Sequence, residues 1–150
     1  MKLYHGSNVA VKVPEIRSVG FYKDFGYGFY CTAFEKQARR WALIKRPGHI
    51  VSVYDYTPSE ELKILSFPSM TEEWLDFVVD CRCGLPHGYD IVEGPMADDT
   101  IWDYVEDFIA GNITREAFLF LVKFKYPTCQ LVFCTDRALH SLSSVNSYAL

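Results

Sequence analysis

Hydrophobic and polar positions along this chain change their period several times, between the alternation typical of strands and the spacing typical of helices. Strands are predicted at about residues 2–5, 49–56, 62–67, 89–93 and 129–135, with a short run around Tyr30. Helices are predicted at about residues 33–45, over Trp74–Cys81, over Ile101–Phe108, at about 114–124, and briefly from Asp136. Because the two kinds of element mix without regular alternation, we expect an α+β domain with a curved or split sheet flanked by helices.

Polar residues before the helical runs predict where several helices begin. Thr32 and Ser69 are each followed three residues later by a glutamate, which matches the capping box, so we expect both to be N-cap residues. Asp98 and Asp99 precede a further helical run and are predicted to act as helix caps. Glycine or proline is expected to end three helices, at Gly48, Gly111 and Pro127.

Length and composition indicate one folded domain over residues 1–150. A chain of this length buries roughly 70% of its unfolded surface, and 49% hydrophobic with 16% aromatic residues supply a core and a stacking site. The net charge of −4 argues against a broad phosphate-binding surface, although Lys36, Arg39 and Arg40 could form a local basic patch. Nucleic acid is therefore not the expected partner.

The five cysteines are irregularly spaced and lie mostly in apolar runs, which indicates reduced thiols and a cytoplasmic protein. Cys81, Cys83 and His87 could begin a zinc site, but a fourth ligand at the usual spacing is missing, so we expect no metal. The first residues lack the apolar stretch of a signal peptide, and the longest apolar run, Ala117–Val122, is too short to span a bilayer. No membrane association is expected.

Three short segments carry the candidate chemistry. Leu3–Ser7, Asp24–Thr32 and Gln130–Thr135 place a histidine, a tyrosine and a glutamine on three strand-like runs, and glycines in the first two would let a flat ligand approach the backbone. Tyr30 and Trp41 are eleven residues apart and could form two stacking walls. This combination suits a nicotinamide dinucleotide, which needs a backbone edge for its carboxamide, flat walls for its ring and a polar group at the adjacent ribose.

His5-Gly6-Ser7, Gly26-x-Gly28-Phe29-Tyr30 and a later strand with an acidic or amide residue together resemble the three-part signature of the ADP-ribosyltransferase superfamily. The likeness is to its His-Tyr-Glu branch, which includes the poly(ADP-ribose) polymerases and diphtheria toxin. Nearly the whole chain more closely resembles a family of small uncharacterised bacterial proteins of that superfamily, with glutamine in place of the third-motif glutamate. The resemblance implies the split-sheet transferase fold and NAD as substrate, without a metal.

The resemblance also implies roles for individual residues. His5, Tyr30 and Gln130 would be catalytic: His5 would bond a ribose hydroxyl, Tyr30 would stack on the nicotinamide, and Gln130 would hold the 2′-hydroxyl of the nicotinamide ribose. Asp98 or Asp99 could also face the substrate. NAD would be bound by His5, Gly6, Ser7, Gly28, Phe29, Tyr30 and Trp41, with Gly6 pairing its backbone with the carboxamide and Trp41 as the second wall.

The implied activity is mono-ADP-ribosylation of a macromolecule, with protein a more natural acceptor than nucleic acid. A toxin of a toxin–antitoxin or phage system is the expected setting, with an antitoxin protein as a possible partner. Three alternatives stay open: a non-catalytic NAD-binding or partner-binding module, an NAD hydrolase, and an RNA 2′-phosphate transferase, which would need a basic surface. Each candidate residue also has a structural interpretation, because a lone histidine, an aromatic pair or a strand glutamine is more often part of the packing than of a site.

Overall fold

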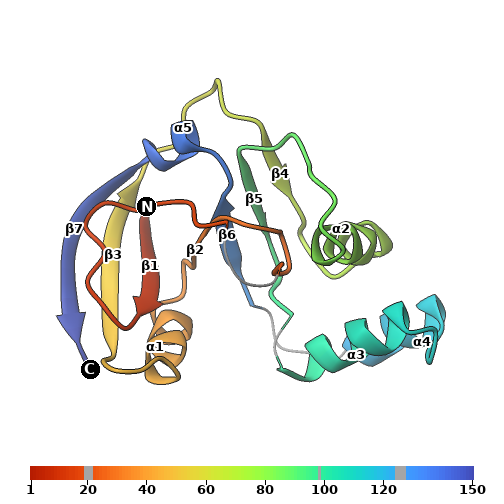
Figure 1. Ribbon diagram of the computed structural model, residues 1–150. Coiled ribbons are helices and arrows are strands. Elements are labelled where there is room, and N and C mark those ends of the chain that lie inside the picture. Colours follow the sequence, from red (N-terminus) through yellow and green to blue (C-terminus); the bar gives the residue numbers. More distant parts are fainter. Residues whose placement is uncertain (19–21, 98, 124–127) are drawn as a thin grey trace.

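The structure is a computed structural model that describes residues 1–18, 22–97, 99–123 and 128–150 (Figure 1). The described residues form seven strands and five helices. In chain order these are β1 (Lys2–Ser7), β2 (Phe29–Cys31), α1 (Glu35–Leu43), β3 (Ile50–Tyr56), β4 (Ile64–Ser66), α2 (Glu72–Arg82), β5 (Ile91–Gly94), α3 (Asp99–Ile109), α4 (Arg115–Val122), β6 (Gln130–Phe133), α5 (Asp136–Leu139) and β7 (Leu142–Ala149).

The strands form two sheets whose side chains share one hydrophobic core, in which the ring of Phe29 in β2 packs edge-on against Tyr54 of β3. One sheet has the order β1-β3-β7 and is antiparallel, and the other has the order β2-β6-β5-β4, in which only β4 and β5 run parallel. A single bridge joins them, with Tyr4 and Thr32 exchanging backbone hydrogen bonds of 2.8 and 2.9 Å. The predicted α+β fold with sheets flanked by helices is confirmed.

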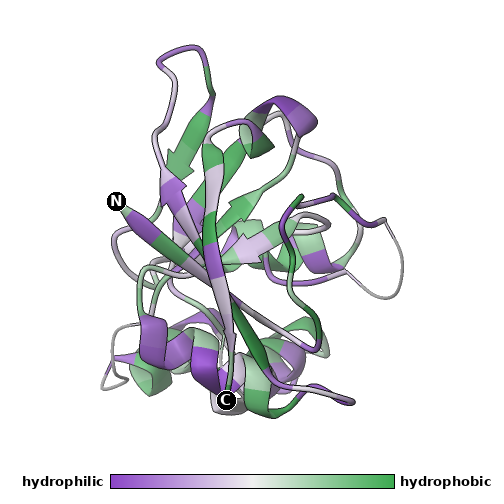
Figure 2. Ribbon diagram, turned by 90° about the vertical axis from the view of Figure 1, so that its left-hand side faces the viewer, coloured by the Kyte–Doolittle hydropathy of each residue, from purple (hydrophilic) through white to green (hydrophobic). Residues whose placement is uncertain are grey.

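The helices divide between the two sheets. α1 packs on β1, while α2, α3 and α4 lie beside the sheet that contains β4, β5 and β6 (Figure 1). The core under the second group contains Phe25, Trp74 and Phe118, all fully buried, and the Trp74 indole nitrogen donates to Pro95 O at 3.0 Å. Figure 2 shows hydrophobic stretches along the central strands. Burial of these large side chains contributes most of the stabilisation that holds the helices in place.

Two of the predicted N-caps are wrong. The N-cap of α1 is Phe34, without a side-chain cap bond, because the Thr32 backbone is already engaged in the bridge to β1. The N-cap of α2 is Thr71 and not Ser69, since the Thr71 hydroxyl accepts from the Trp74 N–H. Thr114 caps α4 as a helix start should, by accepting from the Ala117 N–H.

The ends of the helices follow their predicted positions only in part. α1 ends at Leu43, before Gly48, whereas α3 ends at Ile109, two residues before Gly111 with its φ of 78°. Pro127, expected to end α4, lies outside the described residues, as does Asp98. Of Asp99, only its place as the first residue of α3 is described.

The strand β7 has no counterpart in the sequence prediction. It runs antiparallel to β3 from Leu142 to Ala149, and most of its side chains are exposed. Its apolar residues do not alternate, so its position is decided by backbone pairing with β3 and not by a buried face. In the described part of the chain, no helix is long and apolar enough to cross a membrane.

Candidate functional site

A cavity of about 440 Å³ lies where the two sheets meet. Its walls come from β1, β2, α1, α3 and β6, from the loop before β2 and from the segment after β5. An adjoining hollow of about 510 Å³ shares several of the same lining residues. The structure places six of the predicted residues in the first cavity, namely His5, Gly6, Ser7, Tyr30, Trp41 and Gln130, and places Gly28 and Phe29 in the adjoining hollow.

His5 stands in the middle of β1 and is held from two sides. Its Nδ1 lies 2.7 Å from Tyr30 O, and its ring stacks on Phe29 with centroids 4.3 Å apart. A carbonyl only accepts, so Nδ1 carries the proton and donates, which leaves Nε2 as an acceptor. Burial lowers the pKa of His5 to about 4. His5 is therefore neutral at pH 7 and can accept a hydrogen bond from a ligand hydroxyl.

The neutral state of His5 makes the stability of the fold depend on pH. Because the folded pKa of about 4 lies below the unfolded value of 6.5, the unfolded chain binds the extra proton between these values. We expect His5 to lower the free energy of unfolding by roughly 2–3 kcal/mol as the pH decreases from 6.5 to 4. This pH-dependent loss of stability should be absent in His5→Gln. Urea titrations of both proteins across this range measure it, and identical pH dependences would contradict it.

Tyr30 uses its hydroxyl to hold the loop before β2. The hydroxyl donates to Gly26 O at 2.6 Å and accepts from the Phe25 N–H at 3.1 Å, and burial raises its pKa. The Lys23 ammonium lies over the ring, 5.1 Å from its centroid. The hydroxyl is thus occupied within the protein, and the ring is the part of Tyr30 that a ligand could use.

Tyr30→Phe should therefore separate the two parts of this side chain. It leaves the Phe25 N–H and Gly26 O without their partner, so we expect the free energy of unfolding to fall by about 1–3 kcal/mol. The ring and any stacking on it remain. Denaturant unfolding and NAD titration of the same samples measure the two effects, and unchanged stability would show that the hydroxyl does not hold the loop.

The two predicted glycines are required by packing within the protein. A Cβ on Gly6 would lie 2.1 Å from Ala38 O, because α1 crosses β1 at this residue. A Cβ on Gly28 would lie 2.5 Å from a methyl group of Val132 in β6. At both glycines, protein atoms therefore occupy the space that a Cβ would take. The approach of a flat ligand to the backbone at these residues stays a prediction.

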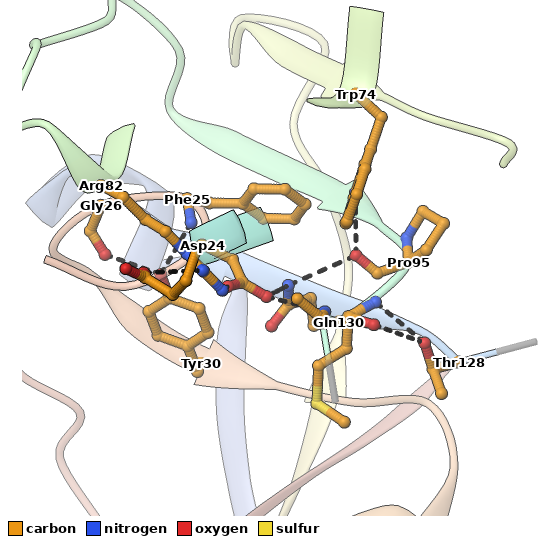
Figure 3. Close-up of polar contacts among 12 residues, drawn as sticks. Asp24, Phe25, Gly26, Tyr30, Trp74, Arg82, Pro95, Thr128 and Gln130 are labelled. Carbon is orange, nitrogen blue, oxygen red and sulfur yellow. Dashed lines mark hydrogen bonds and ion pairs between the residues drawn. The ribbon is translucent and has the colours of Figure 1, made fainter. Parts of the chain in front are cut away.

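Gln130 is 2% exposed, and a buried ion pair lies behind it (Figure 3). Its Nε2 donates to Asp24 Oδ2 at 3.2 Å and, more weakly, to Pro95 O at 3.5 Å. Asp24 Oδ1 in turn lies 2.6 Å from Arg82 Nη2, with both side chains below 8% exposure. The guanidinium of Arg82 stacks over Trp102, its carbon 3.4 Å from the ring centroid.

Sequence reasoning missed Asp24 and Arg82. Asp24 belongs to the segment singled out around Tyr30, where a carboxylate among aromatic residues and glycines is the one signal that could have marked it. Arg82 ends the apolar helix α2 and carried no signal of its own. Gln37 of α1 was missed as well: its Nε2 donates to Cys129 O at 2.7 Å, which holds the chain immediately before Gln130.

Positive charge gathers on the same cavity. Arg17, Lys23 and Lys45 line it, and among its described lining residues Asp24 is the one carboxylate. Burial, together with the nearby Lys45, lowers the pKa of Lys23. None of the ion pairs within the described ranges includes these three cations. In a chain of net charge −4, such a concentration of cations favours an anionic ligand here.

Comparison with known protein families finds one whose model matches nearly the whole chain. A protein-family model described as "Protein of unknown function (DUF3990)" matches residues 1–143. The chain belongs to the DUF3990 family. The matched range contains every residue of the cavity, from His5 to Gln130. No curated protein matches, and no solved structure does.

The cysteines of this DUF3990 chain are all free thiols. Burial raises the pKa of Cys134 to about 12, which keeps that thiol protonated at neutral pH. Within residues 1–18, 22–97, 99–123 and 128–150, no three or more histidine, cysteine or acidic side chains are grouped so as to hold a metal ion.

Proposed function

We propose that this protein binds NAD in the cavity between the two sheets and transfers its ADP-ribose to a macromolecule, as a mono-ADP-ribosyltransferase. The observation that carries the proposal is the gathering of a neutral histidine, two aromatic side chains and a buried amide in one cavity with cations. Each group suits one part of a dinucleotide. The resemblance of the three motifs to the ADP-ribosyltransferase superfamily supports the same proposal.

In this proposal the nicotinamide ring lies against Tyr30 and Trp41, which line the cavity from β2 and α1. His5 Nε2 accepts from a ribose hydroxyl, because Nδ1 is committed to Tyr30 O. The pyrophosphate takes the positive side of the cavity, where Lys23 and Lys45 stand. Gln130 lies at the base, where the nicotinamide ribose would come.

The reaction would break the bond between C1′ of the ribose and the nicotinamide nitrogen. The bonding electron pair leaves with nicotinamide, a nucleophilic atom of the acceptor forms the new bond to C1′, and the proton of that nucleophile goes to solvent. The sugar passes through a cationic state, so the protein contributes by holding the reactants in place and by placing dipoles and charges around C1′. No nucleophile from the protein is needed.

The experiment is release of nicotinamide from NAD by the purified protein, with and without bacterial lysate that supplies acceptors. A transferase labels lysate macromolecules with ADP-ribose, and mass spectrometry identifies the acceptor. Release without labelling indicates an NAD hydrolase. Absence of both release and NAD binding contradicts the proposal. If the protein acts as a toxin, its expression arrests growth, and a cognate antitoxin protein relieves the arrest.

The stacking wall gives a sharper test. Trp41→Ala should weaken NAD binding about tenfold, because ring stacking contributes roughly 1 kcal/mol or more. Leu43→Ala is the matched control, since Leu43 lies on the same helix, is 56% exposed and does not line the cavity. Calorimetric titration measures both. Equal affinities of the two variants would show that the nicotinamide does not stack on Trp41.

One observation favours a second candidate, a module that binds NAD without cleaving it. The residue at the base of the cavity is a neutral amide, and the carboxylate behind it is already paired with Arg82. Less negative charge then faces a developing cation than a free carboxylate would supply. NAD binding by calorimetry without nicotinamide release would decide for this candidate.

A further inference from the structure

The side-chain amide of Gln130 has only one orientation that its surroundings allow. The two hydrogen-bond partners of its nitrogen, Asp24 Oδ2 at 3.2 Å and Pro95 O at 3.5 Å, are both acceptors. The amide oxygen could bond neither of them, so the nitrogen must face this side. Within the described part of the chain, both side-chain hydrogen bonds of Gln130 use this nitrogen. The oxygen Oε1 is therefore the polar atom that Gln130 can offer to the cavity it lines.

Asp24 is itself held in place, which makes it a fixed acceptor. Arg82 binds its Oδ1 at 2.6 Å (Figure 3). The backbone N–H of Ala97 donates to Oδ2 at 2.9 Å, and the Gln130 amide donates to the same oxygen. Arg82 is in turn stacked on Trp102 of α3. The carboxylate thus has contacts on three sides and cannot turn without losing an ion pair or a hydrogen bond.

We propose that Asp24 is a positioning residue for Gln130: it keeps the amide oxygen turned toward the ligand and polarises it through a hydrogen bond from the amide to a carboxylate. This inference rests on the proposed function. A hydrogen bond to an ionised acceptor is stronger than a neutral one and shifts electron density along the amide toward its oxygen. Gln130 Oε1 would then accept from the 2′-hydroxyl of the ribose while the bond from C1′ to nicotinamide breaks.

The same geometry explains why glutamine stands at this position. A glutamate at residue 130 would place a carboxylate oxygen about where Nε2 now lies, 3.2 Å from Asp24 Oδ2 and close to the Pro95 carbonyl. Two carboxylates so close cannot both stay ionised without strong repulsion. A glutamate at residue 130 is thus unfavourable beside Asp24, whereas an exchange of the acid and the amide between the two positions keeps the total charge.

The test compares nicotinamide release by the parent protein, Asp24→Asn, Gln130→Glu and the exchange variant D24N/Q130E. Each single variant should lose about tenfold or more in kcat with little change in KM, because NAD binding does not need the oriented amide. The exchange variant should recover to within about threefold of the parent. Single losses that simply multiply in the exchange variant overturn the proposal.

Asp90→Asn is the matched control for loss of a buried aspartate. Asp90 lies 2.6 Å from Arg137, its side chain is 5% exposed, and it does not line the cavity, so this change removes a buried aspartate that is paired with an arginine elsewhere. Thermal melts should show destabilisation in both asparagine variants, but kcat should fall only in Asp24→Asn. Equal losses of kcat in the two folded variants would overturn the positioning role.

The outcomes also separate this inference from the function on which it rests. A parent protein that releases no nicotinamide overturns the proposed function. An active parent with an unaffected Asp24→Asn overturns only the positioning role.

If Asp24→Asn or Gln130→Glu does not fold, a folded and active D24N/Q130E protein supports the coupling between residues 24 and 130, and a folded but inactive one overturns it. If the exchange variant does not fold either, Gln130→Leu, which keeps the Asp24–Arg82 pair, must lose about tenfold in kcat, and an unchanged kcat overturns the proposal.

Discussion

Gly6→Ala is expected to destabilise the fold by about 3 kcal/mol or more. The new Cβ would lie 2.1 Å from Ala38 O and 2.7 Å from Ala42 N, both of them backbone atoms of α1. Backbone atoms inside a helix cannot move aside as a flexible side chain can, so α1 as a whole would have to shift away from β1. Guanidinium unfolding measures the loss of stability.

The control for this prediction is Gly88→Ala. Nothing lies within 4 Å of a Cβ built on Gly88, so the same chemical change there should alter the free energy of unfolding by less than about 1 kcal/mol. If Gly6→Ala is as stable as Gly88→Ala, the close approach of α1 to β1 is not as described. Gly6 also lines the cavity. If Gly6→Ala folds with α1 shifted, we therefore expect it to lose NAD binding as well.

Arg82→Met is expected to cost about 3–5 kcal/mol of stability, the second large effect. Removing the guanidinium leaves the Asp24 carboxylate buried at 5% exposure, with hydrogen bonds but without its ion-pair partner. The substitution also removes the stacking of the guanidinium on the Trp102 ring. Among the described residues, the Nε of this guanidinium has no hydrogen-bond partner. Denaturant unfolding at pH 7 measures the effect.

Arg115→Met is the matched control, because it removes an arginine that is paired at the surface. Arg115 Nη1 lies 2.7 Å from Asp76, and the two side chains are 34% and 57% exposed. An exposed pair of this kind contributes at most about 1 kcal/mol. The prediction fails if the two methionine variants lose the same stability. The double variant D24N/R82M should regain part of the loss, since it buries no unpaired charge.

Much of the fold could be predicted from the sequence because several segments consist mostly of buried, apolar residues. Ile50–Tyr56 and Gln130–Phe133 lie within predicted strands, and α2 and α3 follow their apolar residues at helical spacing. β7 could not be predicted in this way: its side chains are mostly exposed, and its place depends on hydrogen bonds to β3, which lies far away in the sequence. Such pairing leaves no periodic pattern for a reader of the sequence.

The helix starts show how tertiary contacts override a local motif. Thr32 and Glu35 have the right spacing for a capping box, yet Thr32 is the residue through which the second sheet contacts β1. Its backbone cannot also begin a helix, so α1 starts at Glu35. The helix predicted from about residue 114 does begin there, with Thr114 as its N-cap, because no distant strand competes for this residue.

For the candidate site, the sequence by itself determined which side chains stand out: a histidine, a tyrosine, a tryptophan and a glutamine on separate elements that each form by local pattern. Only the tertiary structure decided what surrounds them. It filled the space beside Gly6 with α1, committed Nδ1 of His5 to Tyr30, and placed Asp24 and Arg82 behind Gln130. Residues 24, 82 and 130 lie on different elements, and the burial that forces a carboxylate, a guanidinium and an amide to satisfy one another arises only when those elements pack together.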